Sequence, residues 1–496
     1  MSIEREAKLQ ASVGFRMPDL HSEGVVASAV EDRRLVATYF DTDDRRLLRW
    51  GVSLRHRSGE GWTVKLPMED QQTNVLARAE HVEPGKDPRR MPSGVRDLVT
   101  AFARAGSLVQ VARLQTRRRE TRIADDLGRP IASVTDDEVS IMQGRRVASR
   151  FRELEVEIAD GVDAAAVDGV IERLRAAGSG PVENVSKLRR AIGPLGHLAP
   201  EIEVADLDGD ATVMDVVRRA IATSVVRLIV HDPRVRLGLE PEAVHQARVA
   251  TRHLRSDLRT FRDLVDPAWS GPLRDELRWL GAALGEVRDI EVLRDRLRGR
   301  EELLGSNDAR MVERLVGVLE ERREAARERL LIEMRQERYV ALLDALVAAA
   351  ASPAVIEDVA ALPGKQVLGV TMTRPWKHLR NAIGHAEQDG TDEALHEARI
   401  RTKRVRYAAE AVASVFGKTA RRFASAAADL QDVLGEHQDA VVADAFLREA
   451  ATSSVARAFV AGELAMYEAQ VKASARDAWP AMWEEALDRK RLRFWT

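Results

Sequence analysis

The chain has 496 residues, of which 45% are hydrophobic and only 4% aromatic, so its cores must be built mainly from aliphatic side chains. Its 77 basic and 79 acidic residues sum to a formal net charge of −2, which by itself neither favours nor excludes an anionic ligand. The absence of cysteine excludes disulfides, thiolate catalysis and cysteine-ligated zinc.

The sequence carries no pattern typical of export or membrane insertion. Charged residues interrupt the first ten positions, where a signal peptide needs an apolar stretch. No apolar run approaches the roughly 18 residues of a membrane-spanning helix. We therefore expect a cytoplasmic protein with no membrane partner, and the length predicts two to four domains.

Residues 1–198 are predicted to form a β-rich domain. Short stretches of alternating polar and apolar residues recur there, and clusters of Gly and Pro separate many of them, as turns do. The clearest stretches are residues 3–8, 52–57, 62–66, 131–134 and 151–158. Helical periodicity appears near residues 94–105 and 164–177.

A linker is predicted at residues 199–211, because the period of the hydrophobic pattern changes after it. Residues 212–496 have the pattern of long amphipathic helices interrupted by Gly, Pro and Asp. The expected fold is therefore α+β and multidomain, with an all-α C-terminal half.

The helical half contains an internal repeat. The segment HQARVATRHLRSDLRTF begins at His245, and the similar segment HEARIRTKRVRYAAEAV begins at His396, 151 positions later (396 − 245). A second pair, LGEVRD from Leu284 and LGEHQD from Leu434, is 150 positions apart (434 − 284). We predict two copies of one helical unit, at about residues 213–350 and 365–495.

Charged residues alternate along the first predicted strand. Glu4, Glu6 and Lys8 are two positions apart and so share one face of a strand. The strand at residues 151–158 repeats the pattern, with one charged face (Glu153, Glu155 and Glu157) and one apolar face (Leu154, Val156 and Ile158). The same-face pairs of arginines are Arg55 with Arg57 and Arg117 with Arg119.

Two interpretations fit this alternation. One is an ordinary solvated sheet face. The other is an antiparallel barrel with a polar interior and its apolar side packed against helices, which several strands with the same pattern favour. A tunnel with both signs of charge suits a polyanion bound together with a divalent metal, because Arg and Lys hold phosphate oxygens and carboxylates hold Mg²⁺ or Mn²⁺.

The first half resembles the CYTH family, the triphosphate tunnel metalloenzymes. The resemblance rests on the ExExK pattern of Glu4, Glu6 and Lys8 and on an ordered set of further stretches: Tyr39–Thr42, Ser53–Arg57, Trp62–Pro67, Thr116–Arg119, Glu153–Glu157 and Ser186–Lys187. It implies an antiparallel β-barrel whose members hydrolyse triphosphate-containing substrates or, in one branch, cyclise ATP.

The resemblance also implies roles for individual residues. Glu4, Glu6 and Lys8 would be catalytic. The residues implied to grip phosphates are Lys8, Arg55, Arg57, Lys65, Arg117, Arg119 and Lys187. The implied metal ligands for Mg²⁺ or Mn²⁺ are Glu4, Glu6, Glu153, Glu155 and Glu157, with Asp136 and Asp137 added where the family often has an Asp-Asp-Gly turn and this chain has Asp-Asp-Glu.

Each copy of the helical repeat carries a basic stripe. His245, Arg248, Arg252 and Arg255 have the same spacing as His396, Arg399, Lys403 and Arg406, which on a helix places each set within an arc of roughly 80°. Arg259 extends the first stripe, and Arg404 flanks the second. Like charges at this spacing repel one another, so a bound polyanion would stabilise them.

The alternatives to a polyanion site are a solvated basic face and arginines paired with acids of neighbouring helices. Finding the stripe twice favours a ligand. The histidine that begins each stripe is interpreted as a phosphate donor, since cations surround it and it belongs to no HxxxH or HxxE arrangement.

The helical half resembles the CHAD family, the conserved-histidine α-helical domain, in both copies. This resemblance implies two pseudo-symmetric four-helix bundles with a basic cleft between them, binding to inorganic polyphosphate, and association with polyphosphate granules. The pairs Gly285 with Asp289 and Gly435 with Asp439 are interpreted as structural.

Three functional hypotheses follow. The first is a metal-dependent triphosphatase whose helical domain binds polyphosphate, and the second is a non-catalytic, granule-associated scaffold. Nucleic-acid binding is disfavoured because no stacking aromatics stand near the stripes. An adenylyl cyclase would need a feature that selects adenine, and the sequence shows none.

Overall fold

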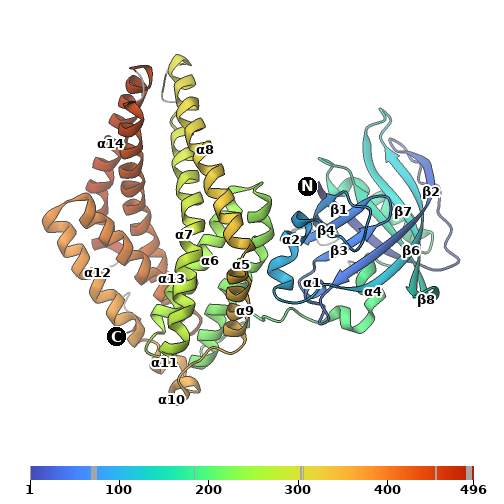
Figure 1. The fold of residues 1–496 in the computed structure, drawn as a ribbon, viewed down its shortest axis with the longest axis horizontal. Coiled ribbons are helices and arrows are strands. Elements are labelled where there is room, and N and C mark those ends of the chain that lie inside the picture. Colours follow the sequence, from blue (N-terminus) through green and yellow to red (C-terminus); the bar gives the residue numbers. More distant parts are fainter. Residues whose placement is uncertain are drawn as a thin grey trace. The chain divides into compact units, whose positions relative to one another are not determined.

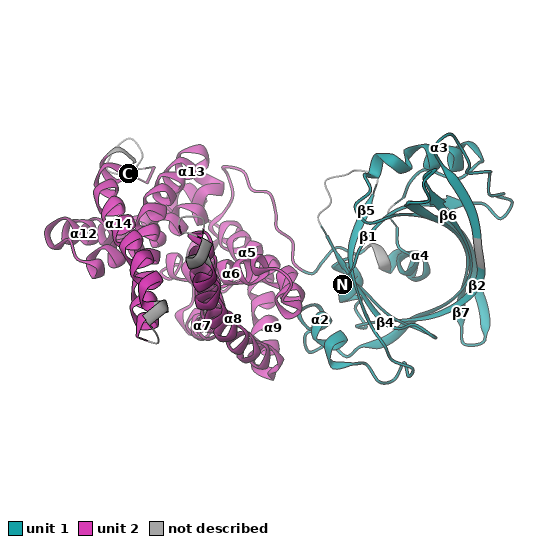
Figure 2. Ribbon diagram, turned by 90° about the horizontal axis from the view of Figure 1, so that it is seen from above, with its two compact units in different colours: residues 1–201 teal, residues 202–496 magenta. Residues whose placement is uncertain are grey.

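The computed structural model describes residues 2–68, 75–183, 185–301, 304, 306–452, 455–486 and 494–495. The chain divides into two compact units, residues 1–201 and 202–496 (Figure 2), and each is described by itself.

The first unit is a closed antiparallel barrel, as predicted. Its strands follow the order β1-β5-β4-β3-β2-β6-β7-β8 around the barrel (Figures 1 and 2). The bounds are β1 Ser2–Ala11, β2 Val26–Asp41, β3 Ser53–Arg57, β4 Gly61–Pro67, β5 Leu76–Glu83, β6 Val109–Ala124, β7 Pro130–Gln143 and β8 Arg146–Ile158.

The pleat of the strands separates charge from apolar surface. On β8 the glutamates point into the barrel, while Leu154, Val156 and Ile158 point outward and are buried. They pack with Leu9 of β1 and with Leu174 in a cluster outside the barrel. The predicted charged interior, with the apolar side packed against a helix, is therefore present.

Short helices cover or enter the barrel. They are α1 Arg46–Arg49, α2 Ser93–Ala103, the 3₁₀ helix η1 Ala164–Val167, α3 Asp168–Ala176, α4 Lys187–Ile192 and the 3₁₀ helix η2 Gly193–His197. The helix α4 lies inside the ring of strands (Figure 2), and its residues Lys187 and Leu188 line the interior. Ser186 caps its start by accepting a hydrogen bond from the Arg189 amide.

The second unit is all-helical, as predicted. Its long helices are α5 Val213–Leu237, α6 Pro241–Thr260, α7 Pro267–Arg298, α8 Ser306–Arg335, α9 Glu337–Ala351, α12 Val370–Asp389, α13 Asp392–Ala451 and α14 Val455–Ala486 (Figure 1). The short helices α10 Glu357–Ala360 and α11 Gly364–Val367 connect α9 to α12. No helix in the described part of the chain is both long and apolar enough to cross a membrane.

The repeat appears as two sets of four helices. Helices α5 to α8 form the first set, and α12, the two halves of α13, and α14 form the second. Gly417, with φ 63° and ψ −137°, breaks α13 into its halves, whereas residues 261–266 separate α6 from α7 in the first copy.

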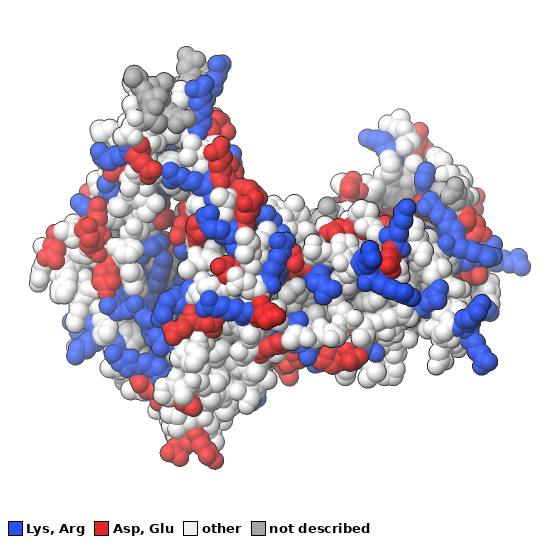
Figure 3. Space-filling model, viewed as in Figure 1, with Lys and Arg blue, Asp and Glu red and all other residues white. Residues whose placement is uncertain are grey.

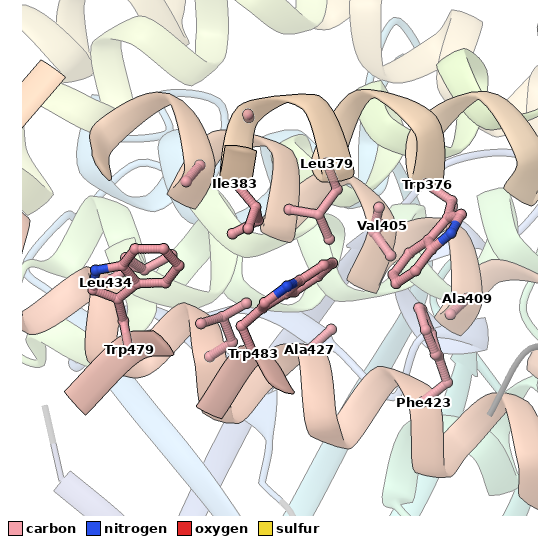
Figure 4. Packing of buried hydrophobic residues seen from close by; sticks show 14 of the residues in the cluster. Trp376, Leu379, Ile383, Val405, Ala409, Phe423, Ala427, Leu434, Trp479 and Trp483 are labelled. Carbon is pink, nitrogen blue, oxygen red and sulfur yellow. The ribbon is translucent and has the colours of Figure 1, made fainter. Parts of the chain in front are cut away.

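Tryptophan and leucine side chains build the core of the second set. Trp376 and Leu379 of α12 pack against Phe423 of α13 and Trp483 of α14 (Figure 4), and the rings of Trp376 and Trp483 stack with centroids 5.5 Å apart. A separate cluster joins α7 and α8 to α13 and α14, with Leu297 and Leu447 fully buried in it. The two copies therefore pack together as one body.

Candidate functional site

The barrel encloses a charged cavity of about 230 Å³. Every strand from β1 to β5 contributes to its lining, together with β6, β8 and α4. Its lining includes the sequence-predicted residues Glu4, Glu6, Lys8, Arg55, Arg57, Lys65, Glu155, Glu157 and Lys187. The structure thus brings most of the predicted tunnel set into one place.

The cations of this tunnel are paired with the chain's own carboxylates. Lys8 lies 3.0 Å from Glu6 and also contacts Glu155. Lys65 contacts Glu4. Two arginines of β3 are paired in the same way, Arg55 with Glu80 at 3.3 Å and Arg57 with Glu60 at 2.7 Å. The tunnel is therefore charge-balanced and is not a purely cationic hollow.

Lys187 joins α4 to three carboxylates of the barrel. Its Nζ lies 2.9 Å from Asp137, 2.6 Å from Glu153 and 2.8 Å from Glu155. Burial alone would lower the pKa of Lys187, but these acids outweigh it and raise that pKa well above its usual value. Lys187 and Lys8 in turn hold the pKa of Glu155 well below its usual value against the effect of burial. Both groups are charged at neutral pH.

The prediction that Arg117 and Arg119 face the tunnel is wrong. Arg117 pairs with Asp32 at 2.6 Å and Arg119 with Asp136 at 3.2 Å, and their side chains are about half exposed on the outer face. The intervening Arg118 points inward, 2.6 Å from Asp137 and 2.9 Å from Glu155. The run of three arginines leaves the register of β6 open, and only its pairing with β2 and β7 fixes it.

Asp136 also lies outside the tunnel. It is buried beneath Arg152, which binds it at 2.7 Å and donates to the carbonyl oxygen of Phe15 at 2.8 Å. Of the predicted pair, Asp137 alone faces inward, where Arg118 and Lys187 neutralise it. Glu153 is fully buried against Lys187 and Arg190 at the α4 end of the interior.

Sequence reasoning missed several residues that line the tunnel. Tyr39, Arg78 and Glu80 line the cavity with Arg118. Arg78 stands opposite Glu4 in the β1–β5 register. Its two-residue spacing to Glu80 is the same-face signal already noted in β1, so this pair could have been found.

Several glutamate carboxylates lie where β1 pairs with β8, and oxygen ligands of this kind suit a hard divalent cation. Glu6 and Glu157 stand opposite each other in register, and Oε1 of Glu6 is buried with no hydrogen-bond partner in the described part of the chain. Loss of hydration, followed by the charges of Glu4 and Glu6, raises the pKa of Glu157. A cation would relieve this repulsion. In the described part of the chain, no three acidic or histidine side chains already stand in metal-binding geometry.

The helical unit contains a cavity of a different character. It measures about 230 Å³ and is lined from α6, α7 and α13 by Arg252, Arg255, Arg259, Arg274, Arg278, Lys403 and Arg404, with Tyr407, Ser256 and Ile400. We call it the central cleft. Lys and Arg side chains gather in the recess of this unit (Figure 3).

Cations of the central cleft repel one another. Burial, then the charges of Arg399 and Arg252, lower the pKa of Lys403 to about 7. Burial, then Arg404 and Arg274, lower the pKa of Arg259 to about 10. No carboxylate lines the cleft in the described part of the chain. Although Arg278 pairs with Asp275 at 2.8 Å, the cleft holds more positive charge than carboxylates neutralise.

Other stripe residues are held by the second motif of the repeat. Arg248 lies 2.7 Å from Asp289, and Arg399 lies 3.9 Å from Asp439. A Cβ on Gly285 would stand 3.7 Å from Arg248, and one on Gly435 would stand 3.6 Å from Arg399. In both copies the arginine packs beside the glycine at ordinary contact distance, and the aspartate four positions later pairs with the arginine.

Besides Arg248 and Arg399, three more predicted residues do not line the central cleft. Arg406 pairs with Glu410 at 2.8 Å, so one of the predicted stripe cations is neutralised by an acid of its own helix. His245 lies near Arg288, and burial followed by that charge lowers its pKa. His396 is half-buried, and its Nδ1 has no hydrogen-bond partner among the described residues.

Known families match both halves of the chain in the expected order. The CYTH domain model matches residues 2–192, and the CHAD domain model matches residues 219–448. Two Mycobacterium tuberculosis proteins, Uncharacterized protein MT2285 and Uncharacterized protein Rv2226, are each 32% identical over 480 residues, covering 90% of this chain and 88% of the relative.

Solved structures also resemble parts of the chain. The CHAD domain from the plant Ricinus communis is 27% identical and covers 58% of this chain and 97% of its own, with a TM-score of 0.48. PptA from Streptomyces chartreusis is 22% identical and covers 55% of this chain and 100% of its own, with a TM-score of 0.45. A putative adenylyl cyclase from Hippeastrum, described as having a dominant triphosphatase activity, is 17% identical. The match covers 39% of this chain and 100% of that protein, with a TM-score of 0.27.

The family matches and the relatives that span both halves agree with the barrel and the helical unit found in the structure. The chain therefore belongs to the family of two-domain proteins in which a CYTH domain, the fold of the triphosphate tunnel metalloenzymes, is followed by a CHAD domain.

Proposed function

We propose that the barrel hydrolyses inorganic triphosphate or short polyphosphate with Mg²⁺ or Mn²⁺, and that the helical unit binds inorganic polyphosphate. The observation that carries this proposal is the contrast in charge between the two sites. Carboxylates match the cations of the tunnel, so a phosphate chain fits there best with its own metal. The central cleft has no matching carboxylates and suits a bare polyanion.

The tunnel residues divide into two groups by chemistry. Arg55, Arg57 and Arg118 present planar guanidinium groups suited to two phosphate oxygens at once, and Lys8 and Lys65 add point charges. Glu4, Glu6 and Glu157 would hold the metal, which when bound neutralises phosphate charge and polarises the phosphoryl group. A metal on those glutamates would compete with Lys65 for Glu4 and with Lys8 for Glu6, and Lys8 would keep its contact with Glu155.

Catalysis in such a tunnel consists of positioning and charge stabilisation. The arginines and lysines fix a terminal phosphoryl group and stabilise the charge that develops as its bond to the rest of the chain breaks. The scaffold hypothesis remains the second candidate, because the three arginines and two lysines assigned to phosphate are already paired with carboxylates. Association with polyphosphate granules belongs to both hypotheses.

Phosphate release distinguishes the enzyme from the scaffold. The substrate is inorganic triphosphate with Mg²⁺ or Mn²⁺, and the proteins are the parent, Glu4→Gln and a control, Glu138→Gln. The control removes a similar charge from the outer face, where Glu138 contacts Arg119. We expect metal-dependent release by the parent and by the control, and none by Glu4→Gln. Absence of release from the parent, with retention of polyphosphate, supports the scaffold.

A further inference from the structure

Two more cavities of the helical unit occupy equivalent positions in the two copies of the repeat. One, of about 430 Å³, lies at the start of α12, and we call it the α12 basin. The other, of about 360 Å³, lies against α5, and we call it the α5 basin. The repeat spacing of 151 residues relates their linings: Arg219, Thr223 and Arg227 of α5 correspond to Val370, Arg374 and His378 of α12.

The two basins differ in charge. Six arginines and one carboxylate, Asp263, line the α12 basin. Three arginines and three acidic residues line the α5 basin, and the acids are Asp206, Asp257 and Glu410. At equivalent positions, Arg259 corresponds to Glu410 and Arg262 to Ala413. Summed over their linings, the α12 basin is therefore cationic and the α5 basin is close to neutral.

The α5 basin is also poorly matched to phosphate in its hydrogen bonding. Oε2 of Glu410 is buried and has no hydrogen-bond partner among the described residues. Asp257 is only 4% exposed, and burial followed by the charge of Glu410 raises its pKa well above its usual value. Arg406 already pairs with the other oxygen of Glu410, Oε1, at 2.8 Å, and a phosphate chain would bring further acceptors to a place where Oε2 lacks a donor.

The two basins also differ in how they connect to the central cleft. The central cleft and the α12 basin share Ser256, Arg259, Arg274 and Arg404 in their linings, so the two adjoin. The repeat equivalent of Ser256 is Tyr407, which lines the central cleft with its ring centroid 4.4 Å from that of His253 in the α5 basin. Among the described residues, the central cleft and the α5 basin share no lining residue.

Building on the polyphosphate binding proposed above, we infer that a bound chain leaves the central cleft in one direction only. Its phosphates continue past Ser256 into the α12 basin, and Tyr407, Asp257 and Glu410 exclude them from the α5 basin. The helical unit therefore prefers chains longer than those the central cleft alone can hold. The pseudo-symmetric repeat has become a one-sided site.

The test compares chain lengths in calorimetric titrations of the full-length protein in EDTA, which removes divalent cations from the tunnel. The probes are inorganic tripolyphosphate and a long-chain inorganic polyphosphate. Ser256→Tyr copies the residue that closes the other side. We expect it to weaken long-chain binding roughly tenfold or more, the worth of a charge-assisted contact, and to weaken tripolyphosphate binding less, so that the preference for the long chain falls.

Two further variants keep the outcome decisive. Thr223→Tyr fills the excluded α5 basin and should change neither affinity. Arg262→Ala with Arg374→Ala neutralises the α12 basin, with Ala413 and Thr223 already tolerated at the equivalent positions, and should reproduce the long-chain loss. If both the Ser256→Tyr and the double variant keep the preference for the long chain, the one-sided site is wrong, although polyphosphate binding itself still stands. A parent that binds neither probe would overturn polyphosphate binding itself.

Discussion

On β6, a shift of one residue in register decides which arginine side chain faces the tunnel. Arg118 faces the tunnel and contacts Asp137 and Glu155, while Arg119, beside it, faces outward and contacts Asp136. Because consecutive side chains of a strand point to opposite faces, these two chemically identical neighbours cannot share a function.

The first prediction tests that difference. Arg118→Ala should lower the rate of triphosphate hydrolysis by roughly 10²–10³-fold, the usual loss for one electrostatic donor at a reacting centre, whereas Arg119→Ala should keep the rate nearly unchanged. The rates are compared by phosphate release, with thermal unfolding followed in parallel. Equal losses in both variants, with both folded, would contradict the assignment.

Lys403 gives the central cleft a pH dependence. Its pKa is lowered to about 7 in the free protein, so above that pH the amine is mostly neutral. A bound polyanion favours the charged form and raises the pKa, so binding takes up a proton just above pH 7. Affinity should therefore fall as pH rises from 7 towards the pKa of the bound state, by up to about tenfold per pH unit.

Calorimetry in EDTA, in buffers of different ionisation enthalpy, measures this proton uptake. The heat of polyphosphate binding should depend on the buffer at pH 8 for the parent and lose most of that dependence in Lys403→Arg, which stays charged. A buffer-independent heat in the parent would show that Lys403 does not change protonation on binding.

At the scale of elements, Gly417 makes one 60-residue helix behave as two. With φ 63° and ψ −137° it occupies a region that residues with a side chain rarely adopt. The turn lets the two halves of α13 take the places that α6 and α7 take in the first copy, where residues 261–266 connect them.

The third prediction concerns this break. Gly417→Ala should lower the free energy of unfolding by about 1–3 kcal/mol through backbone strain, although nothing stands within 4 Å of the new Cβ. Gly384 of α12 also has open space but normal helical geometry, so Gly384→Ala should be neutral or stabilising by about 0.5–1 kcal/mol. Denaturant unfolding compares them, and equal effects would argue against strain at Gly417.

At the scale of the whole molecule, the two units differ in whether carboxylates neutralise their cationic side chains. The tunnel neutralises its cations internally, as Lys187 with its three carboxylates shows. The central cleft leaves its cations exposed to one another, as the lowered pKa of Arg259 shows. A divalent cation should therefore help binding in the tunnel and compete with binding in the cleft.

The fourth prediction separates the two sites. Arg252→Glu combined with Lys403→Glu should weaken polyphosphate binding strongly, while the metal-dependent hydrolysis of triphosphate persists. EDTA should have the reverse effect on the parent, stopping hydrolysis and preserving polyphosphate binding. Loss of both activities in the double variant, with the protein folded, would contradict this division of labour.

Several features followed from the sequence because they depend on local periodicity. The alternation of Glu4, Glu6 and Lys8 predicted a charged strand face, and the stripes beginning at His245 and His396 predicted a repeated helical unit. The pattern on Glu153 to Ile158 predicted which side of the barrel is apolar, and the structure confirms it.

Other features depend on partners distant in the chain. The outward placement of Arg117 and Asp136, and the capture of Arg406 by Glu410, follow from register and packing. Sequence alone determined the fold class and the kinds of residue available to bind phosphate, because periodicity is a local property. Only the tertiary structure decided which cations already have a carboxylate partner and which do not, because charge neutralisation depends on distances between elements.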